Sequence, residues 1–206
     1  METSLTTVIE ELENLFSIFN SHFFNGELTA PVITVSPDTT RGAYGWCTSW
    51  KAWKTGGGAE DEGHYEINLC AEYLNRPFED TCCTLIHEMV HLLNLQLGVQ
   101  DTSRSGHYHN KSFKKAAEEH GLVVEKSAKN GYAHTTLTPD AEAFIQSLGK
   151  DGFTLVRPKV PGLKGSSTKG NNSRKYVCPC CGAIVRATKD VRIICADCDV
   201  EFKLEG

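Results

Sequence analysis

Two histidines and one glutamate near the middle of the chain have the spacing of a metal-dependent hydrolase. His87 and His91 are four residues apart, and on an α-helix such residues project from the same face, so both imidazoles can bind one metal ion. Glu88 is turned by about 100° from His87 around the helix axis. There its carboxylate can take a proton from a water molecule that a zinc ion activates. The motif therefore predicts hydrolysis of an amide bond, with Glu88 as general base.

The residues around this motif are apolar, which argues against a chance match on a surface helix. They are Leu85, Ile86, Met89, Val90, Leu92 and Leu93. Two histidines and a carboxylate in such surroundings are costly unless a partner such as a metal ion satisfies them. A buried hydrogen-bonded cluster without metal is the alternative, and we expect the metal.

A catalytic zinc site needs a third protein ligand and an open fourth position. The candidates downstream are His107, His109, Glu118, Glu119, His120 and His134. The metzincin continuation is excluded, because Asn94 and Leu97 stand where that pattern has glycine and histidine. We expect His109, since it precedes a predicted helix that carries Phe113 on the same face. His107 remains the alternative.

The elements that must position these residues are predicted from apolar periodicity. Four helices are expected: one from residue 5 that stops at Asn25-Gly26, a buried central one over 80–97 with the motif, and two over 110–120 and 138–148. Three strands are expected at 32–35, 44–50 and 64–69. The predicted fold class is α+β, a minimal zincin-like domain of helices packed on a small, about three-stranded antiparallel sheet.

Two Cys-x-x-Cys pairs near the C-terminus form a second metal-ligand pattern. They predict a structural zinc bound by four thiolates, Cys178, Cys181, Cys195 and Cys198. Cys180 is the competitor of Cys181, but the two-residue gap from Cys178 favours Cys181. Residues 184–188 and 191–194 are expected to pair as a hairpin. A module of about 30 residues cannot build an adequate core, so the metal is expected to fold it into a zinc ribbon.

Charge divides the chain into an acidic body and a basic tail. Residues 1–156 carry 11 Lys/Arg against 21 Asp/Glu, and residues 157–206 carry 10 against 5. We therefore expect a metallopeptidase domain at 1–156, a flexible basic linker at 157–175 and the ribbon at 176–206. The tail would attract a polyanion such as DNA. The candidate nucleic-acid contacts are Arg174, Lys175, Arg186, Lys189 and Arg192. A ribbon that only stabilises the body is the alternative, and the aromatic alternation of Trp46, Trp50 and Trp53 is more typical of core than of base stacking.

Composition restricts the compartment. No window approaches the about 18 to 20 apolar residues that cross a bilayer, so we expect no membrane span. The first residues have no basic region before an apolar stretch, as a secretory signal would have. We expect a cytoplasmic protein with reduced cysteines, and the sequence does not indicate its oligomeric state.

The order of these motifs resembles the SprT-like domain, over roughly residues 5–150, with the cysteine-rich tail similar to the zinc ribbon that follows in many members. The resemblance is carried by the run Phe19–Leu28, the strand Ile67–Leu69, the motif His87–His91 and the segment Gly106–Phe113. In that family the third ligand is a histidine four residues before a phenylalanine, which implies His109 here. Asn110 departs from the glycine that often follows this histidine, so His107 stays open.

The resemblance implies a zinc metallopeptidase with a DNA-linked role, because a eukaryotic relative degrades proteins crosslinked to DNA. We therefore expect a zinc endopeptidase that acts on protein substrates and binds two zinc ions, one catalytic and one structural. The alternative is a nucleic-acid-binding adaptor that uses the histidine site only to fold. A hydrolase of another bond is a third reading, since the same water activation serves esters and amides.

Overall fold

The computed structural model describes residues 4–38, 42–56, 62–104, 106–158 and 173–205. The chain divides into two compact units, Met1–Lys159 and Val160–Gly206. Most of the predicted linker, residues 159–172, lies outside the described residues. No helix in the described ranges is both long enough and apolar enough to span a bilayer.

The first unit begins with helix α1, Leu5–Phe23, which packs its apolar face on the core. The hydroxyl of Ser4 caps the helix by accepting a hydrogen bond from the Thr7 backbone N–H at 3.2 Å. The helix ends where Asn25 and Gly26 take positive φ angles of 53° and 74°, the conformation in which a helix commonly stops. The predicted start and stop are both confirmed.

The sheet beneath the central helix has three strands: β1 (Val32–Ser36), β2 (Gly45–Cys47) and β3 (Glu66–Cys70). Their order is β1-β3-β2. β2 runs antiparallel to β3, as expected, but β1 runs parallel to it, so the expectation of a purely antiparallel sheet is wrong. β3 lies between β1 and β2, which run in opposite directions, so it can be antiparallel to only one of them. Alternation in such short strands does not encode direction.

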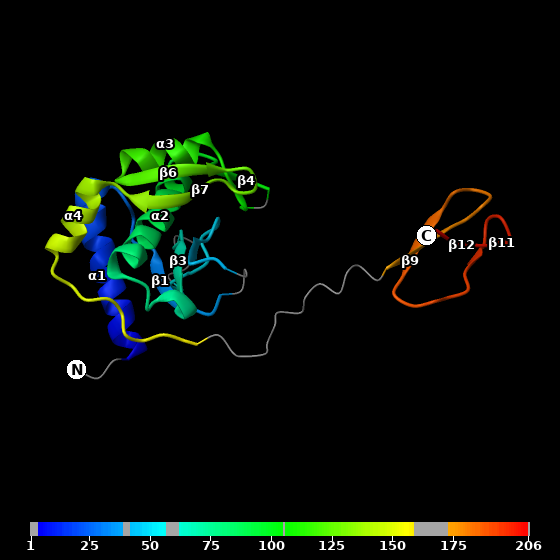
Figure 1. The fold of residues 1–206 in the computed structure, drawn as a ribbon, viewed down its shortest axis with the longest axis horizontal. Helices are drawn as coiled ribbons and strands as arrows, with labels where there is room; N and C mark the ends of the chain where they lie inside the picture. The colour runs from blue at the N-terminus through cyan, green and yellow to red at the C-terminus, as the bar shows by residue number, and fades with distance from the viewer. Residues whose placement is uncertain (1–3, 39–41, 57–61, 105, 159–172, 206) are drawn as a thin grey trace. The chain divides into compact units, whose positions relative to one another are not determined.

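Helix α2, Phe78–Gln96, is the centre of the unit and is buried almost all round. It follows β3 through a 3-10 turn, η1 (Ala71–Tyr73). On one side α2 contacts β2 and β3, and on the other it contacts β7 and the next helix, so it lies between two layers (Figure 1). A helix with no polar stripe can form only in such a place.

A second sheet covers the other side of α2, and the sequence did not predict it. Its four strands, in the order β4-β5-β7-β6, are β4 (Thr102–Ser103), β5 (Tyr108–His109), β6 (Leu122–Ser127) and β7 (Gly131–Leu137). β6 and β7 form an antiparallel hairpin, in which Ser127 pairs with Gly131 at the turn end.

Two short helices complete the unit and confirm the remaining helix predictions. Helix α3, Lys111–Glu119, packs on β6 and β7 (Figure 1), and Asn110 caps it by accepting from Ser112 and Phe113 N–H. Helix α4, Pro139–Ser147, has Thr138 as its cap. With four helices and small sheets in the described ranges, the unit is α+β, as predicted.

The second unit is a small β structure around a core of Tyr176, Cys178, Cys195 and Phe202. Its strands are β8 (Arg174–Val177), β9 (Ile184–Ala187), β10 (Ile194–Cys195), β11 (Val200–Glu201) and β12 (Lys203–Glu205). β9 pairs with β8, and β10 pairs with β11. The predicted pairing of 184–188 with 191–194 is therefore wrong. Each Cys-x-x-Cys pair lies at the turn of a hairpin, so the strands that flank one pair bond to each other.

Candidate metal centres

Three histidines from two elements converge on one point beside α2. His87 and His91 project from that helix, and His109 ends β5. The Nε2 atom of His109 lies 3.2 Å from Nε2 of His87 and 3.0 Å from Nε2 of His91. One nitrogen of each ring falls within 4.8 Å of the others. The three rings thus offer three nitrogen donors to a common centre.

The structure places His109, and not His107, in this group. The backbone N–H of His109 donates to Asn130 O at 3.0 Å, and His109 pairs with Gly131 in the sheet. Gly131 has a φ of 65°, and a Cβ there would overlap the His109 carbonyl oxygen. Only glycine fits this close approach, so the hairpin of β6 and β7 fixes where His109 sits.

The other candidates for the third ligand lie away from the three rings. Glu118 and Glu119 are exposed on α3 and pair with Lys114 and Lys115. His120 lies within hydrogen-bonding distance, 2.6 Å, of the Ala116 carbonyl. His134 lies near Glu125 on the hairpin. None of these side chains belongs to the metal-ligand groups found among the described residues.

Phe113 forms the apolar floor of the centre. It is fully buried, and its ring centroid lies 4.7, 4.7 and 4.6 Å from those of His87, His91 and His109. It reaches this place because Asn110 starts α3 directly after His109. The sequence prediction had placed Phe113 and His109 on one face. The floor keeps bulk water away from the back of the three rings.

Side chains that the sequence did not identify hold two of the rings from behind. His87 Nδ1 lies 3.0 Å from Thr135 Oγ1 on β7, and His91 Nδ1 lies 2.7 Å from Asp101 Oδ2. A proton on Nδ1 leaves the lone pair of Nε2 free for a metal. His109 Nδ1 is the one buried side-chain nitrogen or oxygen without a hydrogen-bond partner among the described residues.

Glu88 lies beside this centre, between α2 and β2. Its side chain is only 6% exposed. The backbone N–H of Cys47 lies near its carboxylate and favours the ionised form. Gly45 makes room for it, because a Cβ at Gly45 would lie 3.4 Å from Glu88 Cγ and 2.7 Å from Asn68 O. Burial raises the pKa of Glu88 from 4.5 to about 7; His91 and the Cys47 N–H oppose the rise, and Asp101 adds to it.

The pKa values of His87 and His109 favour neutral imidazoles, whereas that of His91 is shifted the other way. Burial, together with the neighbouring rings, lowers the pKa of His87 well below 6.5 and that of His109 to about 4. Burial also acts to lower the pKa of His91, but the hydrogen bond to Asp101 and the charges of Glu88 and Asp101 raise it above 6.5. Three imidazoles that offer nitrogen atoms to a common point are consistent with a zinc site.

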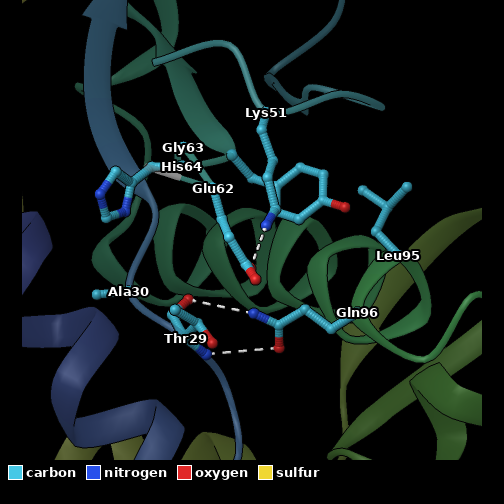
Figure 2. Close-up of a pocket in the computed structure, with 9 residues that line it drawn as sticks. Thr29, Ala30, Lys51, Glu62, Gly63, His64, Leu95 and Gln96 are labelled. Carbon is cyan, nitrogen blue, oxygen red and sulfur yellow. Dashed lines mark hydrogen bonds and ion pairs between the residues drawn. The ribbon is translucent and has the colours of Figure 1, made fainter. Parts of the chain in front are cut away.

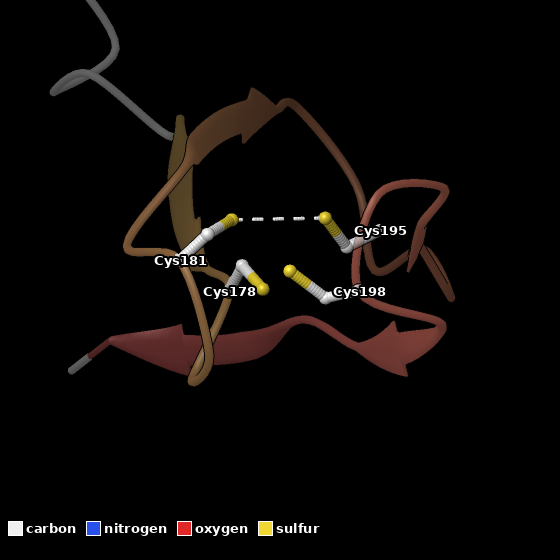
Figure 3. A group of neighbouring side chains, drawn as sticks. All are labelled: Cys178, Cys181, Cys195 and Cys198. Carbon is white, nitrogen blue, oxygen red and sulfur yellow. Dashed lines mark hydrogen bonds between the residues drawn. The ribbon is translucent and has the colours of Figure 1, made fainter.

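The second unit holds a group of four thiols. The Sγ atoms of Cys178, Cys181, Cys195 and Cys198 lie within 4.8 Å of one another and face a common centre (Figure 3). The N–H groups of Cys181 and Cys180 lower the pKa of Cys178 to about 7, although burial opposes them. The pKa of Cys195 is raised, chiefly by burial, and that of Cys198 is raised by its neighbouring thiols. Cys180 is exposed and outside the group. The cluster fits a small zinc ribbon.

Three of the five predicted nucleic-acid contacts are already in ion pairs within the ribbon. Arg174 pairs with Asp190 at 2.7 Å and Arg192 with Glu201 at 3.3 Å, and Lys175 pairs with Glu205. Arg186 and Lys189 form no ion pair with other described residues. Of the five predicted contacts, only these two therefore carry a charge that no described carboxylate pairs with.

Two of the three tryptophans lie on the surface and not in the core, where they were expected. Trp50 and Trp53 are 64% and 45% exposed, and Trp46 on β2 is half-buried. The core interpretation is wrong for the first two because they follow the end of β2, where the chain leaves the sheet. The Trp53 indole N–H donates to Glu66.

A cavity of about 530 Å³ lies at the C-terminal end of α2, with Leu95 and Gln96 in its wall (Figure 2). Its polar groups satisfy one another: Lys51 pairs with Glu62 at 3.0 Å, and the Gln96 carboxamide bonds the Thr29 backbone. Neither Glu88 nor the three histidines line it. We do not assign the cavity to the metal centre.

Comparison with known families agrees with the geometry. The model of the SprT-like family matches residues 12–135, which is more than half of the chain and includes α2 and all three histidines. No curated protein and no solved structure matches the chain. The four-cysteine cluster lies beyond the matched range and fits the zinc ribbon expected after such a domain. The resemblance seen in the sequence is confirmed, and the chain belongs to the SprT-like family.

Proposed function

We propose that the protein is a zinc-dependent metalloendopeptidase that hydrolyses peptide bonds in protein substrates, with a catalytic zinc at His87, His91 and His109 and a structural zinc at the four ribbon cysteines. The observation that carries this proposal is the buried carboxylate of Glu88 beside three converging imidazole nitrogens. A purely structural site has no need of a base beside an open ligand position.

The chemistry follows from the groups around the centre. When bound, a zinc ion lowers the pKa of a water molecule to about 7 and polarises a carbonyl group. The Glu88 carboxylate accepts the proton of the attacking water and then passes it to the leaving amine nitrogen. Burial raises the pKa of Glu88 to about 7 in the metal-free chain, and a nearby cation would favour the ionised form that a general base needs.

The position of β2 supports an extended peptide as substrate. Tyr44 O and Thr48 N bond to β3, so the backbone groups of Gly45 and Cys47 point to the other edge of β2. In the described part of the chain no strand pairs with that edge. Cys47 N–H meets Glu88 there. A substrate strand that pairs with β2 would pass directly beside the general base.

DNA association through the basic linker and the ribbon is the second part of the proposal. The unpaired charges of Arg186 and Lys189 support it, because each can neutralise a phosphate. The competing possibility is an adaptor that binds nucleic acid without peptidase activity. We also propose that the protein works in the cytoplasm, because four of its cysteines cluster as candidate metal ligands, a use of thiols that is typical of a reducing compartment.

The test is proteolysis of a DNA-binding protein by the full chain, with and without single-stranded DNA. Glu88→Gln at equal zinc content is expected to lower the cleavage rate by about 100- to 10,000-fold, the range of a general base. Glu118→Gln, an exposed glutamate on α3, is the matched control and should cleave like the wild type. Equal cleavage by wild type and Glu88→Gln would refute the peptidase assignment. A cleavage rate that does not change with DNA would count against the proposed DNA association and leave the proposed peptidase activity standing.

A further inference from the structure

We propose that Asp101 is a positioning residue of the zinc centre, with its side chain fixing His91 and its backbone fixing the segment that carries His109. This inference rests on the proposed zinc site. Asp101 lies outside the predicted motifs and comes directly before β4, five residues after the end of α2.

The side chain of Asp101 is fixed on two sides by α2. Its side chain is 9% exposed, and its Oδ2 lies 2.7 Å from His91 Nδ1 and accepts a hydrogen bond from Asn94 Nδ2 at 3.1 Å. His91 and Asn94 are three residues apart and therefore lie on one face of the helix. Asn94 is itself 3% exposed. Among the described residues, the side chains of His91 and Asn94 are thus the hydrogen-bond partners that hold this carboxylate.

The backbone of Asp101 holds the third ligand. Its carbonyl oxygen accepts a hydrogen bond from Asn110 N–H at 2.8 Å, and the next residue, Thr102, pairs with His109 across β4 and β5. The side chain of Asn110 donates in turn to Gln100 O at 2.8 Å. Residues 100–102 therefore clamp residues 109–110. One short segment links a ligand of α2 to the ligand of β5.

The chemistry explains why a carboxylate stands at this place. A buried carboxylate is costly without compensating charge. The side-chain partners of Asp101 are one imidazole, that of His91, and one neutral amide, that of Asn94. A zinc ion on the far nitrogen of that imidazole supplies the missing positive charge. Asp101 accepts the Nδ1 proton, so Nε2 of His91 presents its lone pair to the centre, and the bond makes the ring a better donor. Loss of such a partner commonly weakens metal affinity by about 10- to 100-fold.

The experiment is a zinc competition titration of the full chain against a chromophoric chelator, which separates two classes of bound zinc. His91→Ala identifies the class at the histidine site. Asp101→Ala is expected to weaken that class by about 10- to 100-fold and to leave the ribbon class unchanged. Asp101→Asn should lose less, because an amide oxygen still accepts the Nδ1 proton. Glu125→Ala, which removes the carboxylate from the exposed pair with His134, is the matched control and should bind zinc like the wild type.

A second readout separates positioning from folding. In the zinc-loaded wild type, nitrogen-resolved NMR of the histidine rings should show an Nδ1–H of His91 that is protected from solvent exchange. Asp101→Asn should keep the folded spectrum and lose part of this protection. Wild-type affinity in Asp101→Ala would overturn the inference while the zinc site stands. If the wild type binds no zinc at its histidines, the proposed function fails as well.

Discussion

The buried carboxyl of Glu88 should make the stability of the metal-free protein depend on pH, and Glu88→Gln should remove that dependence. In the folded chain burial raises its pKa to about 7, against an ordinary value of 4.5. Between these two pH values the folded state holds a proton that the unfolded state has released. Stability contributed by this group is therefore fully present below pH 4.5 and is lost as the pH rises through 7.

The size of the effect follows from the shift. At about 1.4 kcal/mol for each pKa unit, the free energy of unfolding should fall by about 3 kcal/mol between pH 4.5 and pH 8 through this group alone. Screening by solvent does not reduce this figure much, because the side chain is 6% exposed. A glutamine at position 88 has no proton to lose. The difference between wild type and variant reports this contribution together with the change at His91, whose pKa the Glu88 charge raises.

The assay is urea unfolding in excess chelator at a series of pH values, followed by tryptophan fluorescence. All three tryptophans lie in the unit Met1–Lys159, so the signal is independent of a ribbon that has lost its metal. Saturating zinc should shrink the difference, because a nearby cation favours the ionised carboxylate. Parallel pH profiles for wild type and Glu88→Gln in chelator would refute the reasoning.

Three further outcomes are expected. Metal analysis should find two zinc ions per chain, with one remaining in Cys178→Ser and one in His91→Ala; a single ion in the wild type would mean that one site is misassigned. Gly131→Ala should weaken zinc binding at the histidines and destabilise the first unit by about 1 to 3 kcal/mol or more. The reason is that residue 131 has a positive φ and that a Cβ there would overlap the His109 carbonyl oxygen. Urea unfolding measures the loss of stability, and a variant as stable as the wild type would contradict the prediction. The double variant Arg186→Glu/Lys189→Glu should weaken the binding of single-stranded DNA and flatten its salt dependence. The effect should be larger than that of Arg174→Ala, because the charge of Arg174 is already paired. Equal effects in fluorescence anisotropy would exclude Arg186 and Lys189 as the DNA-binding surface.

The parts of the site that were predictable are those encoded locally. The spacing of His87, Glu88 and His91 on one buried helix determines their relation to each other. His109 followed from its place before a helix with Phe113 on the same face. The Cys-x-x-Cys spacing identified the four thiols that the structure groups together.

The parts that escaped prediction depend on contacts between distant segments. β4 and β5 have two residues each, too few to show a periodicity, and so the second sheet was missed. Asp101 and Thr135 reach their histidines only through that sheet. The direction of β1 relative to β3 and the pairing of the ribbon strands are likewise set by topology, which alternation of apolar residues does not report.

The hairpin of β6 and β7 holds His109 in place, and this has a consequence for biosynthesis. During synthesis α2 emerges first, with two histidines that can hold a metal only as an incomplete site. The third ring takes its place when Asn130 and Gly131 have been made and docked against β5. A nascent or partly unfolded chain therefore lacks the complete centre. In the proposed peptidase, hydrolytic competence would therefore come only with the finished fold.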